Sequence, residues 1–247
     1  MSFENESTER SQFSRPGFIV AAVIVGLLVV LGLVVTTVAI LKPKEEPPVP
    51  EPAVTEPAEP VAPSSNESKS SCGLDLVELT GTLDTSPPIT WDFAGTTAFP
   101  VSPEFGPADS TDDGIRTCFA RTPEGAALAA SVGVAYMGDP ASTMAWREYA
   151  LVPGEVRDEL LAQSAPEGNL ASIRSQVTAV RLLAFDGDSA KVDVGMSITA
   201  NGTTGYFSTI VPLIWQDGDW RADFPPSFLT DEMVKLPNLT GYVYWKE

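Results

Sequence analysis

Residues 18–41 constrain this chain most strongly, because they form one apolar run, FIVAAVIVGLLVVLGLVVTTVAIL, that contains no charged residue. A helix of about 24 residues, with a rise of about 1.5 Å per residue, is long enough to cross a bilayer. A lone apolar segment in lipid must also satisfy its own backbone hydrogen bonds, and a helix does so. The run therefore predicts a single transmembrane helix at residues 18–41, preceded by a short tail at residues 1–17.

The orientation of this helix does not follow from charge alone. Arg10 and Arg15 on one side balance Lys42 and Lys44 on the other, so the rule that places positive charge in the cytoplasm is undecided. The apolar run is longer than the roughly 7–15 residues of a cleaved signal peptide, which is the alternative, so an uncleaved signal anchor is favoured. The proline-rich segment and the two cysteines that follow the apolar run favour a cytoplasmic tail and an extracytoplasmic domain at the cell membrane.

A proline-rich stalk is predicted at residues 42–71. Eight prolines recur between glutamates in this segment, removing backbone donors and disfavouring both helix and sheet. In the extended polyproline conformation, at about 3.1 Å per residue, such a disordered linker spans up to about 90 Å. It would act as a spacer between the membrane and a single domain at residues 72–247.

The predicted domain is acidic and contains both cysteines. From residue 72 onward it has 24 acidic and 10 basic residues, which disfavours binding to nucleic acid. Cys72 and Cys118 are 46 residues apart. Outside the cytoplasm such a pair favours one structural disulfide, whereas a reactive pair would lack both the C-x-x-C spacing and a histidine.

Residue periodicity indicates an α+β fold. A threonine-proline-glutamate sequence followed by an alanine-rich run predicts a first helix. Later segments, in which apolar and polar residues alternate with a period of two, predict strands, and turns rich in Asp, Asn and Gly separate them. The helices predicted are 125–137, 139–150 and 153–163; the strands are 176–185, 190–200, 206–215 and 220–224, with shorter ones at 74–79 and 89–93. We expect the helices to pack on one face of a curved antiparallel sheet, with the tail 225–247 laid back on the domain.

The alternation is clearest in residues 190–200. Val194, Met196 and Ile198 point to one face, whereas Lys191 and Asp193 point to the other. This pattern is typical of a half-buried antiparallel strand, with the first set facing the core and the second facing solvent.

One hairpin carries a resemblance to known proteins. The segment 206–224, YFSTIVPLIWQDGDWRADF, resembles the final hairpin of uncharacterised actinobacterial single-pass membrane proteins found with mobile elements. The architecture of span, stalk and outer domain is similar to that of membrane proteins of the conjugation machinery. The resemblance implies that the outer domain has the nuclear-transport-factor-2-like cone fold of assembly factors in conjugation and type IV secretion.

The sequence lacks the usual signs of an enzyme. It contains no histidine, which removes the commonest general base and most zinc ligands, and the acidic segment 109–114 does not match a calcium loop. Carboxylate pairs occur at Asp217 with Asp219 and at Asp186 with Asp188, where a hairpin turn alone would explain them. We therefore expect no catalytic residue, no cofactor and no metal.

Two functions remain as expectations. The first is a non-enzymatic assembly or scaffold protein of a conjugative transfer or cell-envelope complex, with protein partners and self-association into a homo-oligomer. The second is an extracytoplasmic module that binds a small ligand or a cell-wall fragment in a cleft between helices and sheet. Glu148 and Glu155 are the carboxylates expected nearest such a cleft, and we expect both to be dispensable.

Overall fold

The computed structural model of the chain describes Ser70 and residues 72–165, 172–229 and 233–247. The predicted tail, the predicted transmembrane helix and nearly all of the predicted stalk lie outside the described residues. Within the described ranges, no helix is long and apolar enough to cross a membrane.

Three α-helices connect the first strands to the later ones: α2 (Pro123–Met137), α3 (Thr143–Ala150) and α4 (Glu155–Ala162). The predicted start of the first helix is confirmed, because the Thr122 side chain accepts a hydrogen bond from the Gly125 backbone at 3.1 Å. The other two helices are shorter than predicted. Before α3, the residues from 139 to 142 form a turn in which Ser142 donates a hydrogen bond to Asp139 at 2.6 Å.

The main sheet is mixed. Its strands lie in the order β1-β2-β5-β6-β7-β8, with β10 beside β5 and β9 beside β7. Their bounds are β1 Thr90–Ala94, β2 Thr97–Val101, β5 Ile173–Phe185, β6 Ser189–Ala200, β7 Thr203–Gln216, β8 Asp219–Ala222, β9 Val234–Leu236 and β10 Val243–Tyr244. The prediction of an antiparallel sheet is wrong for one pair, since β2 and β5 run parallel. All three α-helices lie between these two strands in sequence, and a parallel pair needs such a long crossover.

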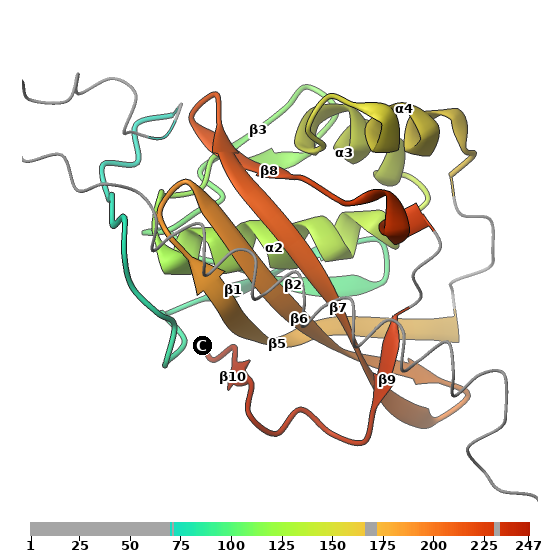
Figure 1. Cartoon of the computed structure of the whole chain (residues 1–247). Coiled ribbons are helices and arrows are strands. Elements are labelled where there is room, and N and C mark those ends of the chain that lie inside the picture. Colours follow the sequence, from blue (N-terminus) through green and yellow to red (C-terminus); the bar gives the residue numbers. More distant parts are fainter. Residues whose placement is uncertain (1–69, 71, 166–171, 230–232) are drawn as a thin grey trace, which may run out of the picture. The chain divides into compact units, whose positions relative to one another are not determined.

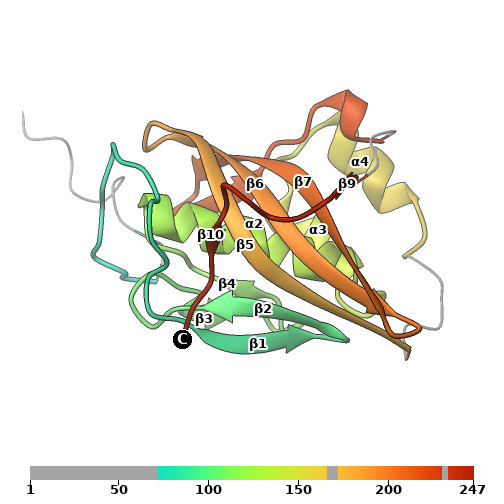
Figure 2. The same cartoon turned by 90° about the horizontal axis from the view of Figure 1, so that it is seen from below.

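The sheet curls around α2 (Figures 1 and 2), so the predicted α+β fold with helices on a curved sheet is confirmed. Two irregularities in the pairing of β5 with β6, after Val177 and after Leu182, are β-bulge positions that increase local twist. Helix α2 contacts strands along the whole sheet and packs against α3. Nearly every residue of α2 is buried, as expected of a helix that is apolar on all sides.

The C-terminal strap, residues 233–245, crosses the face of the sheet opposite α2. Strand β9 pairs with β7 and β10 pairs with β5, so the residues between them pass over β6. Leu239 is fully buried there, and a Cβ atom on Gly195 of β6 would lie 2.7 Å from its Cδ2 atom. The prediction of a tail laid back on the domain is confirmed.

The strap overturns one prediction about β6. Asp193, expected to face solvent, is only 4% exposed. Its carboxylate forms an ion pair with Arg181 at 2.7 Å and accepts a hydrogen bond from the Tyr242 hydroxyl at 2.6 Å. The alternation along β6 was correct, but the outer face is covered by the C-terminal strap.

The segment between the cysteines is only partly as predicted. The strand expected at 89–93 is confirmed as β1, whereas the one expected at 74–79 is wrong, because only Val77 forms a bridge there, to Arg121. Strand β2 and a separate small pair, β3 (Asp109–Ser110) and β4 (Arg116–Thr117), were not predicted. These strands are short and depend on partners distant in sequence.

Candidate functional site

Cys72 and Cys118 lie together at disulfide-bonding distance, with their Cα atoms 6.0 Å apart. The Ser70 hydroxyl lies 3.0 Å from each sulfur atom. Cys118 has a positive φ of 73°, which is uncommon for a residue other than glycine. The arrangement fits the structural pair expected from the sequence.

The carboxylate of Asp219 holds this region to the end of the sheet. Oδ2 accepts hydrogen bonds from the Cys118 backbone N–H and the Tyr149 hydroxyl, both at 2.9 Å. Oδ1 accepts from the backbone N–H groups of Phe119 at 3.0 Å and Trp220 at 2.9 Å. Burial, reinforced by the Asp219 charge, raises the pKa of Tyr149 to about 12. Asp219 is therefore a buried structural anchor, which its place in a predicted hairpin turn did not indicate.

The remaining carboxylates considered from the sequence do not converge on one site. Asp217 is exposed in the β7–β8 turn. Hydrogen bonds from Ser189 hold the pKa of Asp186 below its usual value, and Asp188 forms an ion pair with Arg121. Glu148 and Glu155 are exposed and line two different surface pockets. Over the described ranges, no group of three or more Cys, Asp or Glu side chains is placed to hold a metal ion.

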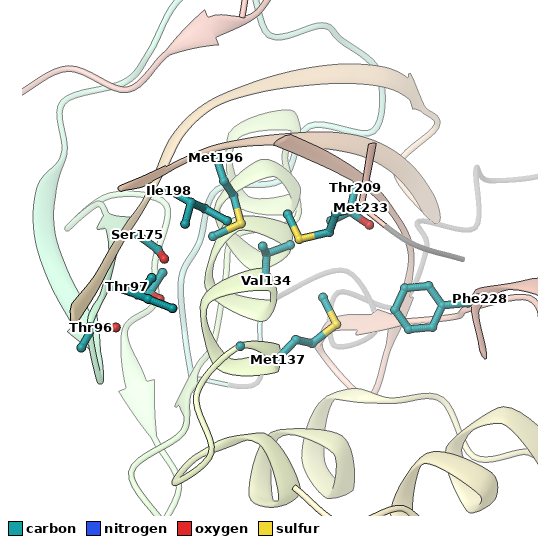
Figure 3. Close-up of a pocket in the computed structure, with 12 residues that line it drawn as sticks. Thr96, Thr97, Val134, Met137, Ser175, Met196, Ile198, Thr209, Phe228 and Met233 are labelled. Atoms are coloured by element: carbon teal, nitrogen blue, oxygen red, sulfur yellow. The ribbon is translucent and has the colours of Figure 1, made fainter. Parts of the chain in front are cut away.

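An apolar pocket of about 400 Å³ lies between the C-terminal end of α2 and the inner face of the sheet (Figure 3). Its volume is within the range of about 300–1,000 Å³ that is typical of small-molecule sites. None of the described residues that line it is charged. The apolar side chains that line it are Val134, Met137, Ile173, Met196, Ile198, Phe228 and Met233, and the hydroxyl side chains are Thr96, Thr97, Ser175 and Thr209.

The pocket exists because the helix is shorter than the strands that face it. At about 1.5 Å per residue, the 15 residues of α2 extend about 22 Å, whereas the 12 residues of β6 extend about 40 Å at about 3.3 Å per residue. Met196 and Ile198 continue the inward face of β6 near the point where α2 ends at Met137. The prediction that Met196 and Ile198 face inward is confirmed. The pocket is the space beyond the C-terminal end of α2 that none of the described helices occupies.

The sequence analysis predicted a cleft between the helices and the sheet. It did not predict any of the residues that line the pocket as site residues. Two of them, Met196 and Ile198, were interpreted as core, and Phe228 lies in the 3₁₀ helix η3 (Pro226–Leu229), which was not predicted. The available signal was the difference in length between the alanine-rich helix and the strand at residues 190–200. Which side chains meet around the pocket depends on strand pairing, which the sequence pattern did not specify.

The comparisons with known proteins identify a family without a known activity. No curated protein and no solved structure matches the chain. A family model described as a domain of unknown function, DUF8175, matches residues 52–244, which covers the described fold and the pocket and begins within the predicted stalk. Because this match spans most of its length, the chain belongs to the DUF8175 family.

Proposed function

We propose that the domain is a non-enzymatic binding module and that the pocket between α2 and the sheet takes a small apolar ligand. The observation that carries this proposal is a pocket of about 400 Å³ whose described lining residues include three methionines and a phenylalanine and no charged side chain. Pockets of this kind bind mainly by removing apolar surface from water. The cell-wall fragment considered from the sequence is a weaker candidate, since any charged group on it would find no ionic partner among the described lining residues.

The pocket favours ligand binding over a purely structural role. A packed core normally leaves few voids larger than a water molecule, because unfilled space forfeits dispersion contacts. Here Val134, Met196 and Phe228 face open volume instead of one another. A ligand would restore the missing contacts, and the flexible methionine side chains can adapt to its shape.

The proposal includes the membrane topology expected from the sequence. Residues 18–41 cross the membrane once, the proline-rich segment acts as a spacer, and the domain lies outside the cytoplasm. The closeness of Cys72 and Cys118 supports this location, since disulfides persist in oxidising compartments. On this proposal the tail at residues 1–17 is cytoplasmic.

A role in assembling an envelope or conjugative complex is the second candidate. It is favoured by Phe93, which is 65% exposed on β1, the strand at one end of the sheet. An apolar side chain beside an open strand edge is a feature of protein contact sites. The proposed cone-fold relationship to conjugation factors belongs to this candidate, and concentration-dependent self-association that Phe93→Ser abolishes would support it.

Binding of N-phenylnaphthylamine, an uncharged probe that fluoresces in apolar surroundings, tests the main proposal. We expect saturable binding that Met137→Trp weakens by at least about tenfold, because the larger side chain occupies the pocket. Leu183→Trp is the control, since Leu183 is exposed on β5 outside the pocket. If the probe does not bind, or if both variants bind it equally, the pocket is not the ligand site.

A further inference from the structure

The pocket has a polar end. Thr96 and Thr97 at the start of β2 lie beside Ser175 of β5, and Thr97 and Ser175 are directly paired in the parallel ladder. Figure 3 shows these three residues together on one side of the pocket, with Phe228 on the opposite side. Three hydroxyl side chains are therefore gathered at the β2–β5 wall, whereas that of Thr209 on β7 lies beside Met233.

The hydroxyl of Thr97 is of particular interest. The residue is only 7% exposed, yet its side chain makes no hydrogen bond to any described residue. Ser175, next to it, likewise makes no side-chain hydrogen bond within the described ranges. Both residues line the pocket with hydroxyl groups that are available to hydrogen-bond, so this wall suits a ligand that brings a hydrogen-bonding oxygen.

The opposite end of the pocket is mainly apolar, with Thr209 beside Met233 as its hydroxyl residue. Met137 ends α2, Phe228 lies in η3, and Met233 begins the C-terminal strap with 39% of its surface exposed. All three line the pocket. Unbranched methionine side chains adapt to flexible apolar groups, so this end suits an alkyl chain.

A charged head group of either sign would find no counter-ion among the described residues that line the pocket. The part of the lining that the structure describes contains no Lys or Arg, so a carboxylate placed at the hydroxyl wall would lose its hydration without gaining a cation. The domain from residue 72 onward also has 14 more acidic than basic residues, and its field repels anions. A neutral hydroxyl or ester group meets neither penalty.

We propose that the ligand is an uncharged, single-chain amphipathic molecule, such as a long-chain alcohol or a fatty-acid ester. Its oxygen hydrogen-bonds to Thr97 and Ser175, and its alkyl chain extends toward Met137, Phe228 and Met233. This inference rests on the proposed binding function and assigns the chemical class and orientation of the ligand.

Competition against N-phenylnaphthylamine tests the ligand class with decanol, methyl decanoate and ionised decanoate. We expect decanol and the methyl ester to displace the probe and decanoate to be at least about tenfold weaker, because its charge must be desolvated. Shortening the alcohol should weaken binding about fourfold for each methylene removed. Equal displacement by decanoate, or no dependence on chain length, would overturn the inference.

The variant Thr97→Val tests the orientation, because it removes the hydroxyl while keeping a similar shape. We expect it to weaken decanol about three- to tenfold relative to any change in probe affinity, with Ser175→Ala acting in the same direction. Thr203→Val, at an exposed position of β7 outside the pocket, is the matched control. Should Thr97→Val fail to fold, Ser175→Ala alone decides.

The two proposals fail in different ways. If the probe binds but neither hydroxyl variant changes the affinity for decanol, this inference is wrong and the proposed binding function stands. If the probe does not bind to the wild-type protein, the binding function itself is wrong, and with it this inference.

Discussion

The substitution Asp219→Asn should destabilise the domain strongly, although the sequence suggested that this turn carboxylate could be changed at little cost. Asp219 is 1% exposed, and its two oxygen atoms together accept four hydrogen bonds. An asparagine amide can replace only one of the two oxygens. Whichever way it is oriented, its NH₂ group faces at least one buried backbone N–H that has lost its acceptor.

The magnitude follows from these contacts. A hydrogen bond to a charged group contributes about 1.5–3 kcal/mol, and removing one partner of a buried charged network costs about 3–5 kcal/mol. The Tyr149 hydroxyl can turn and accept from the new amide, which offsets part of the loss. We therefore expect Asp219→Asn to lower the free energy of unfolding by about 3–5 kcal/mol, a large share of the roughly 5–15 kcal/mol of a typical domain.

Asp217→Asn is the matched control, two residues away in the same turn. Asp217 is exposed and has a φ of 55°, a conformation that asparagine adopts readily. We expect its free energy of unfolding to stay within about 0.5 kcal/mol of the wild type. Urea denaturation of both variants, with the cysteine pair in the same state, measures the difference, and equal stability of the two would refute the anchor role of Asp219.

Three further predictions concern the cysteine pair, the topology and alkaline pH. Mass mapping of unreduced protein should find Cys72 and Cys118 in linked peptides, and reduction should cost about 2–4 kcal/mol of stability; free thiols would contradict this. Protease added to intact, wall-stripped cells should remove the domain, whereas full protection would contradict the proposed topology. Because the pKa of Tyr149 is raised to about 12 from 10.0, the stability that this shift contributes is complete below pH 10 and declines toward pH 12. Tyr149→Phe should remove that part of the decline in pH-dependent urea titrations.

Local chemistry predicted the elements of the domain well. Thr122 and Pro123 indicated the start of α2, and the period of two indicated β6, because capping and alternation involve neighbouring residues. The parallel pairing of Thr97 with Ser175 had no such signal. It joins segments separated by three helices, so only the folded chain decides it.

The candidate site was predictable only as a cleft. A helix over 125–137 facing a longer strand over 190–200 implies uncovered inward positions, since helix and strand differ in rise per residue. The gathering of Thr96, Thr97 and Ser175 on one side and of Met137, Phe228 and Met233 on the other depends on β2, η3 and the strap lying around that space. Those placements result from packing across the whole domain.

The sequence by itself determined the apolar run at 18–41, the acidic charge, the lack of histidine and the α+β class, because these depend on composition and short periodicity. Only the tertiary structure decided the roles of two aspartates. Asp219 and Asp193 both occupy positions that read as solvent-facing, and both are buried. Asp219 accepts a hydrogen bond from the Cys118 backbone, and Asp193 accepts one from Tyr242 of the C-terminal strap. Burial of a carboxylate depends on which distant segments cover it and supply its hydrogen bonds.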